Sequence, residues 1–128
     1  MSTFPFDAKS GPVMVEDTMT GPLKSVALAL VLDTGATTSL VNVDLLRQVG
    51  LIAEPASRRV AMTTGSAVEM VPLVVLTRLS ALGQHRFGFS VVAHSLPPGS
   101  GVDGLLGLDF LRALAITIDF PNRRIMIA

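Results

Sequence analysis

One carboxylate in this sequence stands where it could take part in chemistry. Asp33 follows the apolar segment Val26–Leu32 and is followed by Thr34, Gly35 and Ala36. A buried charge is costly unless it is hydrogen-bonded or paired. A carboxylate at the end of a buried strand therefore favours a functional role, with the next backbone N–H groups and a hydroxyl available to hold it. The alternative is a simple turn, because Asp bonds its own backbone and Gly tolerates positive φ.

A second informative segment, VDGLLGLDFL, runs from Val102 to Leu111. Its aliphatic pair, Leu105 and Leu106, leads directly into Gly107. This pattern predicts a buried strand, a close approach of backbone at the glycine, and then a short amphipathic helix. By itself it is a structural pattern and carries no chemistry.

Between these two segments the sequence predicts a β-hairpin. Residues 58–63 and 67–76 have strand-type composition and flank Thr64, Gly65 and Ser66. Gly65 stands at the tip, where a tight turn requires positive φ.

The remaining pattern predicts a mostly β chain with one or two short helices. Strands are expected at 12–16, 23–32, 86–92, 116–118 and 125–127, and helices at 42–49 and 109–114. Residues 1–22 are expected to be an N-terminal segment, either irregular or an edge strand, and residues 23–128 to form one domain.

Composition excludes several classes of function. The net charge is zero, which argues against nucleic acid as a partner. The absence of cysteine excludes disulfides, thiol nucleophiles and thiolate metal sites. His85 and His94 have no acidic residue between them, so we expect no metal site. Charged residues make up 16%, against roughly 25% in an average domain, which suggests that part of the surface is buried against a partner.

The chain is expected to be cytoplasmic and to have no contact with a membrane. Its longest unbroken apolar run, Val26–Leu32, is far shorter than the ~20 residues of a membrane helix. The first residues show no basic stretch followed by an apolar one, so no signal peptide is expected.

The combination of these patterns resembles a known family. A strand running into Asp-Thr-Gly-Ala, a glycine-tipped hairpin about thirty residues later, and an aliphatic pair with glycine before a short helix are similar to the retropepsin-like aspartic proteases. That family includes retroviral proteases, the protease domain of Ddi1-type ubiquitin shuttles, and bacterial single-domain relatives. The stretch from Gly104 to Ile127 is most similar to the last two branches. The resemblance covers roughly Leu23 to Ile127 and implies a closed β-barrel, the acid protease fold, as a homodimer.

The resemblance also implies roles for the residues around Asp33. Asp33 matches the catalytic aspartate, and Thr34 matches the residue whose hydroxyl reaches across the dimer. Gly35 matches a position whose backbone touches substrate. Ala36 stands where pepsin-like enzymes carry serine, and Asp109 is given no catalytic part.

The resemblance assigns the other two motifs to substrate binding. Thr64, Gly65 and Ser66 match the tip of the flap, although they lack the tyrosine found in pepsins. The segment Leu105, Leu106 and Gly107 would line or back the substrate pockets.

The number of Asp-Thr-Gly motifs has a consequence for assembly. Pepsin-like enzymes carry two in one chain, whereas this chain carries one and therefore supplies half a site. Two Asp33 carboxylates about 3 Å apart would share one proton, one acting as general base on a water and the other as general acid. We therefore expect a homodimeric aspartic endopeptidase without a cofactor, acting on extended, apolar-flanked peptides or unfolded protein. The alternative is a non-catalytic peptide-binding or dimerisation module with the same fold.

Overall fold

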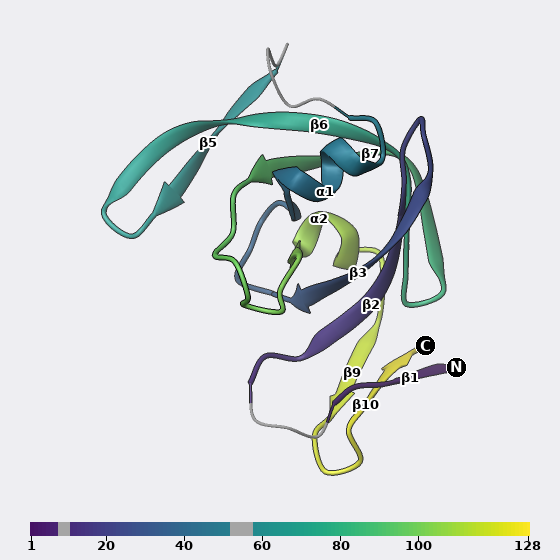
Figure 1. Cartoon of the computed structure of the whole chain (residues 1–128). Coiled ribbons are helices and arrows are strands. Elements are labelled where there is room, and N and C mark those ends of the chain that lie inside the picture. The colour runs from purple at the N-terminus through teal and green to yellow at the C-terminus, as the bar shows by residue number, and fades with distance from the viewer. Residues whose placement is uncertain (8–10, 52–57) are drawn as a thin grey trace.

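The described part of the chain, residues 1–7, 11–51 and 58–128 of a computed structural model, is built mainly from β-strands (Figure 1). The strands are β1 (Ser2–Pro5), β2 (Met14–Thr20), β3 (Ser25–Leu32), β4 (Leu40–Asn42), β5 (Arg59–Thr64), β6 (Ala67–Ala81), β7 (Gln84–His94), β8 (Gly104–Leu106), β9 (Ile116–Asp119) and β10 (Arg124–Ile127). The helices are α1 (Val43–Gln48) and α2 (Leu108–Leu111). The expectation of a mostly β chain with two short helices is confirmed.

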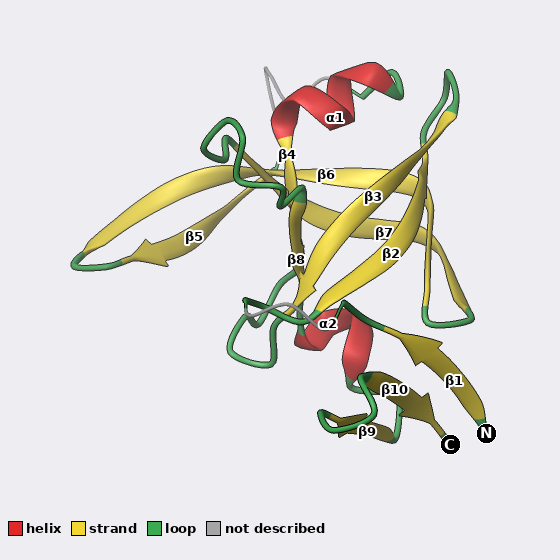
Figure 2. Ribbon diagram, turned by 60° about the horizontal axis from the view of Figure 1, so that its bottom comes forward, coloured by secondary structure: helices red, strands yellow, loops and turns green. Residues whose placement is uncertain are grey.

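Six strands close into a barrel in the order β2-β3-β8-β4-β7-β6, and pairing between β2 and β6 completes the ring. Two of the contacts are parallel, β3 with β8 and β4 with β7, and the rest are antiparallel. β5 pairs only with the first part of β6, so this hairpin extends away from the barrel (Figure 2). The closed barrel expected from the sequence is confirmed.

Successive side chains of each strand point alternately into and out of the barrel. Those that point inward are mainly aliphatic. In β2 the side chains of Val15, Asp17 and Met19 are buried, while the residues between them are exposed. Asp17 is therefore a carboxyl group inside an apolar core.

The two helices close the barrel. α1 begins after Asn42, whose side-chain oxygen accepts a hydrogen bond from the Asp44 N–H at 3.2 Å, and it buries Leu46 completely. α2 lies between the barrel and the terminal strands (Figure 2). It buries Phe110, whose ring meets Phe89 edge to face at 5.7 Å between centroids.

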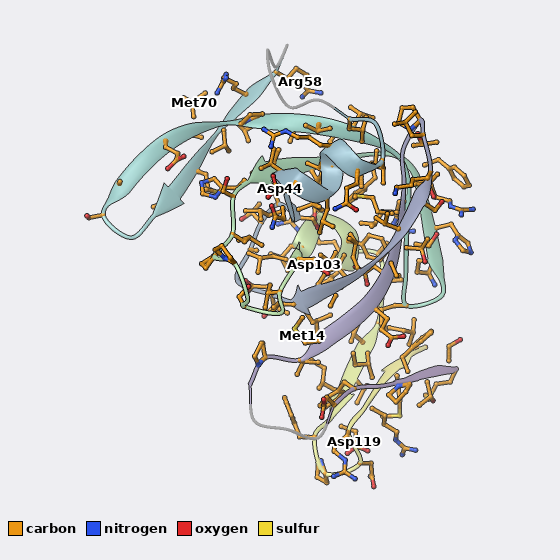
Figure 3. The ribbon with its side chains drawn as sticks, in the orientation of Figure 1. Met14, Asp44, Arg58, Met70, Asp103 and Asp119 are labelled. Atoms are coloured by element: carbon orange, nitrogen blue, oxygen red, sulfur yellow. The ribbon has the colours of Figure 1, made fainter. Side chains whose placement is uncertain are left out.

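The two chain ends form a small separate sheet in the order β1-β10-β9, with Ser2 opposite Ile127. β1 is an edge strand of this small sheet. In the turn between β9 and β10, the side chain and backbone N–H groups of Asn122 donate to the Asp119 carboxylate and hold its pKa below the usual value. Figure 3 shows Asp119 at this end of the molecule and Met70 on the distant β5–β6 hairpin.

The β6–β7 hairpin differs from the expected strand boundaries. The sequence predicts strands that end at 76 and resume at 86, but β6 continues to Ala81 and β7 begins at Gln84. The two turn residues, Leu82 and Gly83, have φ of 52° and 72°. A leucine with positive φ is uncommon, so the sequence offers only Gly83 as a sign of this turn.

Candidate active site

Asp33 is the first residue after β3, on a loop fixed by backbone hydrogen bonds. Its N–H donates to the Leu106 carbonyl at 3.0 Å, which attaches the start of the loop to β8. Its Oδ1 accepts from the Gly35 N–H at 2.9 Å, and its carbonyl accepts from the Ala36 N–H at 3.2 Å. The orientation of the carboxylate is therefore set by its own loop.

The segment after β8 holds this loop from below. The Leu108 N–H donates to the Ala36 carbonyl at 2.8 Å. A Cβ at position 107 would lie 2.7 Å from the same carbonyl oxygen. Gly107 is therefore required by the close packing of two backbones, as the sequence pattern predicts.

A buried polar network joins the end of the loop to α2. The Ser39 hydroxyl donates to Asp109 Oδ1 at 2.6 Å and accepts from the Gly107 N–H at 2.9 Å. The Ser39 N–H donates to Asp109 Oδ2 at 2.9 Å. Sequence reasoning did not identify Ser39. The only available signal was a hydroxyl residue directly before the apolar pair Leu40 and Val41.

A groove with a volume of about 690 Å³ opens beside Asp33. The described lining comes from the Asp33 loop, β4, β5, the end of β7 and β8. Its large apolar members belong to one packed cluster and are Leu40, Val60, Met62, Val92, Leu96 and Leu105. The groove thus combines a carboxylate with an extended aliphatic wall.

The structure brings some of the sequence-predicted residues to this groove. Asp33, Gly35, Ala36 and Leu105 line it. Thr34 is exposed beside them and does not line the groove in the single chain.

Other predicted residues lie further away. Leu106 is fully buried behind the groove, and Gly107 lies beneath the loop. Gly65, with φ of 59° as expected for a tight turn, is at the exposed hairpin tip with Ser66. The side chain of Thr64 is outside the described part of the structure. Among the residues that the structure describes, the hairpin contributes residues 60–63 of β5 to the groove.

The two histidines do not form a pair. His85 lies near the start of β7 and His94 is its last residue, about 30 Å apart at the usual rise per residue of a strand. His94 lines the groove, a position that sequence reasoning did not foresee. Among the helices of the described residues, none is long and apolar enough to cross a membrane.

A protein-family model described as aspartyl protease matches residues 12–110 of the chain. The chain belongs to this family. A search of curated protein sequences finds no significant match. The family assignment agrees with the resemblance drawn from the Asp-Thr-Gly-Ala and Leu-Leu-Gly motifs.

Solved structures of aspartic proteases share the fold at low sequence identity. A retropepsin-like aspartic protease from Rickettsia conorii is 13% identical with a TM-score of 0.73, and the match covers 98% of this chain and 88% of that one. The retroviral protease-like domain of Ddi1 from Leishmania major is 17% identical with a TM-score of 0.60, covering 93% and 90%. An aspartic proteinase from Irpex lacteus is 19% identical with a TM-score of 0.57, covering 99% of this chain but 46% of that one.

Proposed function

We propose that this aspartyl protease family member is an aspartic endopeptidase that acts as a homodimer, with one Asp33 from each subunit. One observation carries the proposal. The Asp33 carboxylate lies in an open groove with an aliphatic wall and is oriented by the Gly35 N–H. The groove offers room and apolar contacts for an extended peptide beside a fixed carboxylate.

The need for two subunits is supported by the number of carboxylates. The chain carries one Asp-Thr-Gly triplet, and it matches less than half of the Irpex lacteus proteinase. Oligomers built on a two-fold axis bring the same patch of both subunits together. The exposed Thr34 beside Asp33 is then available for contact with the second subunit.

In such a dimer the two carboxylates share one proton, because like charges at short distance cannot both ionise. The ionised carboxylate removes a proton from a water, which attacks the peptide carbonyl carbon. The protonated carboxyl group donates to the carbonyl oxygen, and a proton then passes to the leaving amine. No cofactor takes part. The rate is expected to be bell-shaped in pH, since only the singly protonated pair is active.

The test compares the wild type with Asp33→Asn on a denatured protein and a peptide library. The substitution keeps the side-chain volume but removes proton exchange, so we expect no cleavage from a folded protein. Asp44→Asn is the matched control, because Asp44 is an exposed carboxylate on α1 that pairs with Arg47 and is not among the described residues that line the groove. Peptide binding by the wild type without cleavage between acidic and neutral pH would support the non-catalytic module instead.

The dimer is tested by mixing subunits. Excess Asp33→Asn chains should suppress wild-type activity through inactive heterodimers, and dilution should lower the specific activity. Activity that stays strictly proportional to enzyme, in a protein that light scattering shows to be monomeric, would contradict the two-subunit site.

A further inference from the structure

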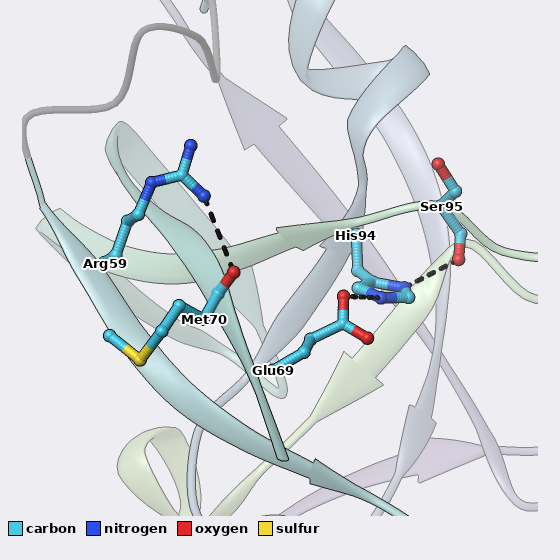
Figure 4. A network of polar contacts seen from close by, with 5 residues as sticks. All are labelled: Arg59, Glu69, Met70, His94 and Ser95. Carbon is cyan, nitrogen blue, oxygen red and sulfur yellow. Dashed lines mark hydrogen bonds and ion pairs between the residues drawn. The ribbon is translucent and has the colours of Figure 1, made fainter. Parts of the chain in front are cut away.

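The end of β7 connects the wall of the groove to the β5–β6 hairpin. His94, the last residue of β7, lines the groove with its side chain 29% exposed. Its Nε2 lies 3.3 Å from Oε1 of Glu69 on β6, and its Nδ1 lies 2.8 Å from the Ser95 carbonyl oxygen (Figure 4). One imidazole ring thus links the wall of the groove to the β6 strand of the hairpin.

Both atoms that face this ring are hydrogen-bond acceptors. A backbone carbonyl has no proton to donate, and an ionised carboxylate has none either. Each ring nitrogen must therefore carry a proton for both contacts to form, which is the case only in the imidazolium ion. A neutral imidazole has a single N–H and can keep only one of the two contacts.

We propose that His94 is a positioning residue whose protonation holds the β5–β6 hairpin against the groove. Protonated His94 keeps both the Ser95 carbonyl and Glu69. The neutral ring keeps its single N–H on the nearer Ser95 carbonyl, at 2.8 Å, and loses the 3.3 Å contact to Glu69, which releases the hairpin. This inference rests on the proposed function in one respect, because it takes the groove beside Asp33 to be the substrate-binding groove. Because β5 residues 60–63 line the groove, the position of the hairpin determines the shape of the groove.

The charged groups around His94 are few among the described residues. β6 contributes Glu69, and the active-site loop contributes Asp33, which lines the same groove. On β5, the Arg59 guanidinium lies 3.5 Å from the Met70 carbonyl, beside this part of β6 (Figure 4). On β4, the residue opposite His94 is the uncharged Asn42.

The pair is partly exposed, with side-chain exposures of 29% and 51%. Ion pairs of this kind have a small effect on an equilibrium, about two- to fivefold. That is enough to change how often a hairpin opens, but not enough to affect whether the barrel folds.

The experiment measures hydrogen exchange of the β5 and β6 amides between pH 5 and pH 8, corrected for the intrinsic exchange rate. It uses the Asp33→Asn protein, so the result does not depend on peptidase activity. Protection of residues 59–71 should be about two- to fivefold lower at pH 8 than at pH 5. A protection factor that does not change with pH would overturn the proposal.

Two variants identify the residues responsible. His94→Phe keeps a ring but removes both donors, so protection should be low at every pH. Glu69→Gln offers an amide that can accept from or donate to the ring, so protection should lose its pH dependence. His85→Phe, which alters the only other histidine of the chain, should behave as the parent protein does. A His94→Phe protein with the same pH dependence as its parent would refute the role of His94.

A kinetic measurement separates the two proposals. If the protein cleaves peptides, His94→Phe should raise KM at pH 5 about two- to fivefold, with the effect on KM rather than on kcat. A wild type without activity would refute the proposed function and leave the exchange result standing. Pure kcat effects in His94→Phe would refute the positioning role.

Discussion

Asp17 offers the most direct test of the physical account of the barrel. Its side chain is 3% exposed, and no described residue donates a hydrogen bond to either of its oxygens. Burial raises its pKa from 3.8 to about 8. The carboxyl group is therefore neutral in the folded protein at pH 6 and ionised in the unfolded chain.

The sign of the effect on stability follows from this difference. Between about pH 4 and pH 8 the folded state holds a proton that the unfolded state has lost, so the free energy of unfolding falls as pH rises. A difference of about four pH units corresponds to an upper limit of roughly 6 kcal/mol. That loss is a large part of the total stability of an ordinary domain.

The perturbation is Asp17→Asn, which keeps the volume of the side chain but cannot ionise. Near pH 4 the two proteins should have similar stability, because both side chains are neutral. By pH 8 the variant should be more stable by several kcal/mol. The assay is urea unfolding at a series of pH values and one fixed protein concentration, since subunit association would also contribute.

Glu16→Gln is the matched control, because Glu16 is an exposed carboxylate next to Asp17 on the same strand. It should leave the pH dependence of unfolding unchanged. A parallel loss of stability in Asp17→Asn and the wild type between pH 5 and pH 8 would show that Asp17 does not carry this pH dependence.

Three further substitutions test the loop and the hairpin. Ser39→Ala removes the hydroxyl that accepts from the buried Gly107 N–H, so it should lower the free energy of unfolding by about 1–3 kcal/mol; urea unfolding measures this, and Ser100→Ala on the surface is the control. Gly107→Ala places a Cβ 2.7 Å from the Ala36 carbonyl oxygen. It should displace the Asp33 loop and abolish peptidase activity, whereas full activity would show that the close packing is not needed. A Cβ added at Gly65, where φ is 59°, meets no atom within 4 Å, so the cost of Gly65→Val is mainly backbone strain of about 1–3 kcal/mol. We expect a clear loss of turnover with only a small decrease in the thermal midpoint of unfolding. Unchanged kinetics would mean that the hairpin does not cover substrate.

The sequence predicted the backbone features of the site better than its side-chain contacts. The turn at Asp33 and the close approach at Gly107 each depend on the local order of residue types. A carboxylate after an aliphatic strand and a glycine after an aliphatic pair carry that information within a few positions.

Contacts between distant residues left no comparable signal. Ser39 and Asp109 are 70 positions apart, and Glu69 and His94 are 25 apart. Each pair meets only because strand register and barrel closure bring it together. The burial of Asp17 was also invisible, because an acidic residue in an alternating strand is normally on the solvent face.

The continuity of β6 has a mechanical consequence. Its 15 residues span about 50 Å at the usual rise of a strand, and they belong to the hairpin at one end and to the barrel wall at the other. No loop separates the two parts, so the hairpin has no hinge of the usual kind. Pro72, just before β6 begins to pair with β7 at Leu73, lacks an N–H and weakens the strand there. The hairpin should therefore bend elastically near Pro72, and a displacement of its tip should be transmitted along β6 to β2, which pairs with the last residues of β6.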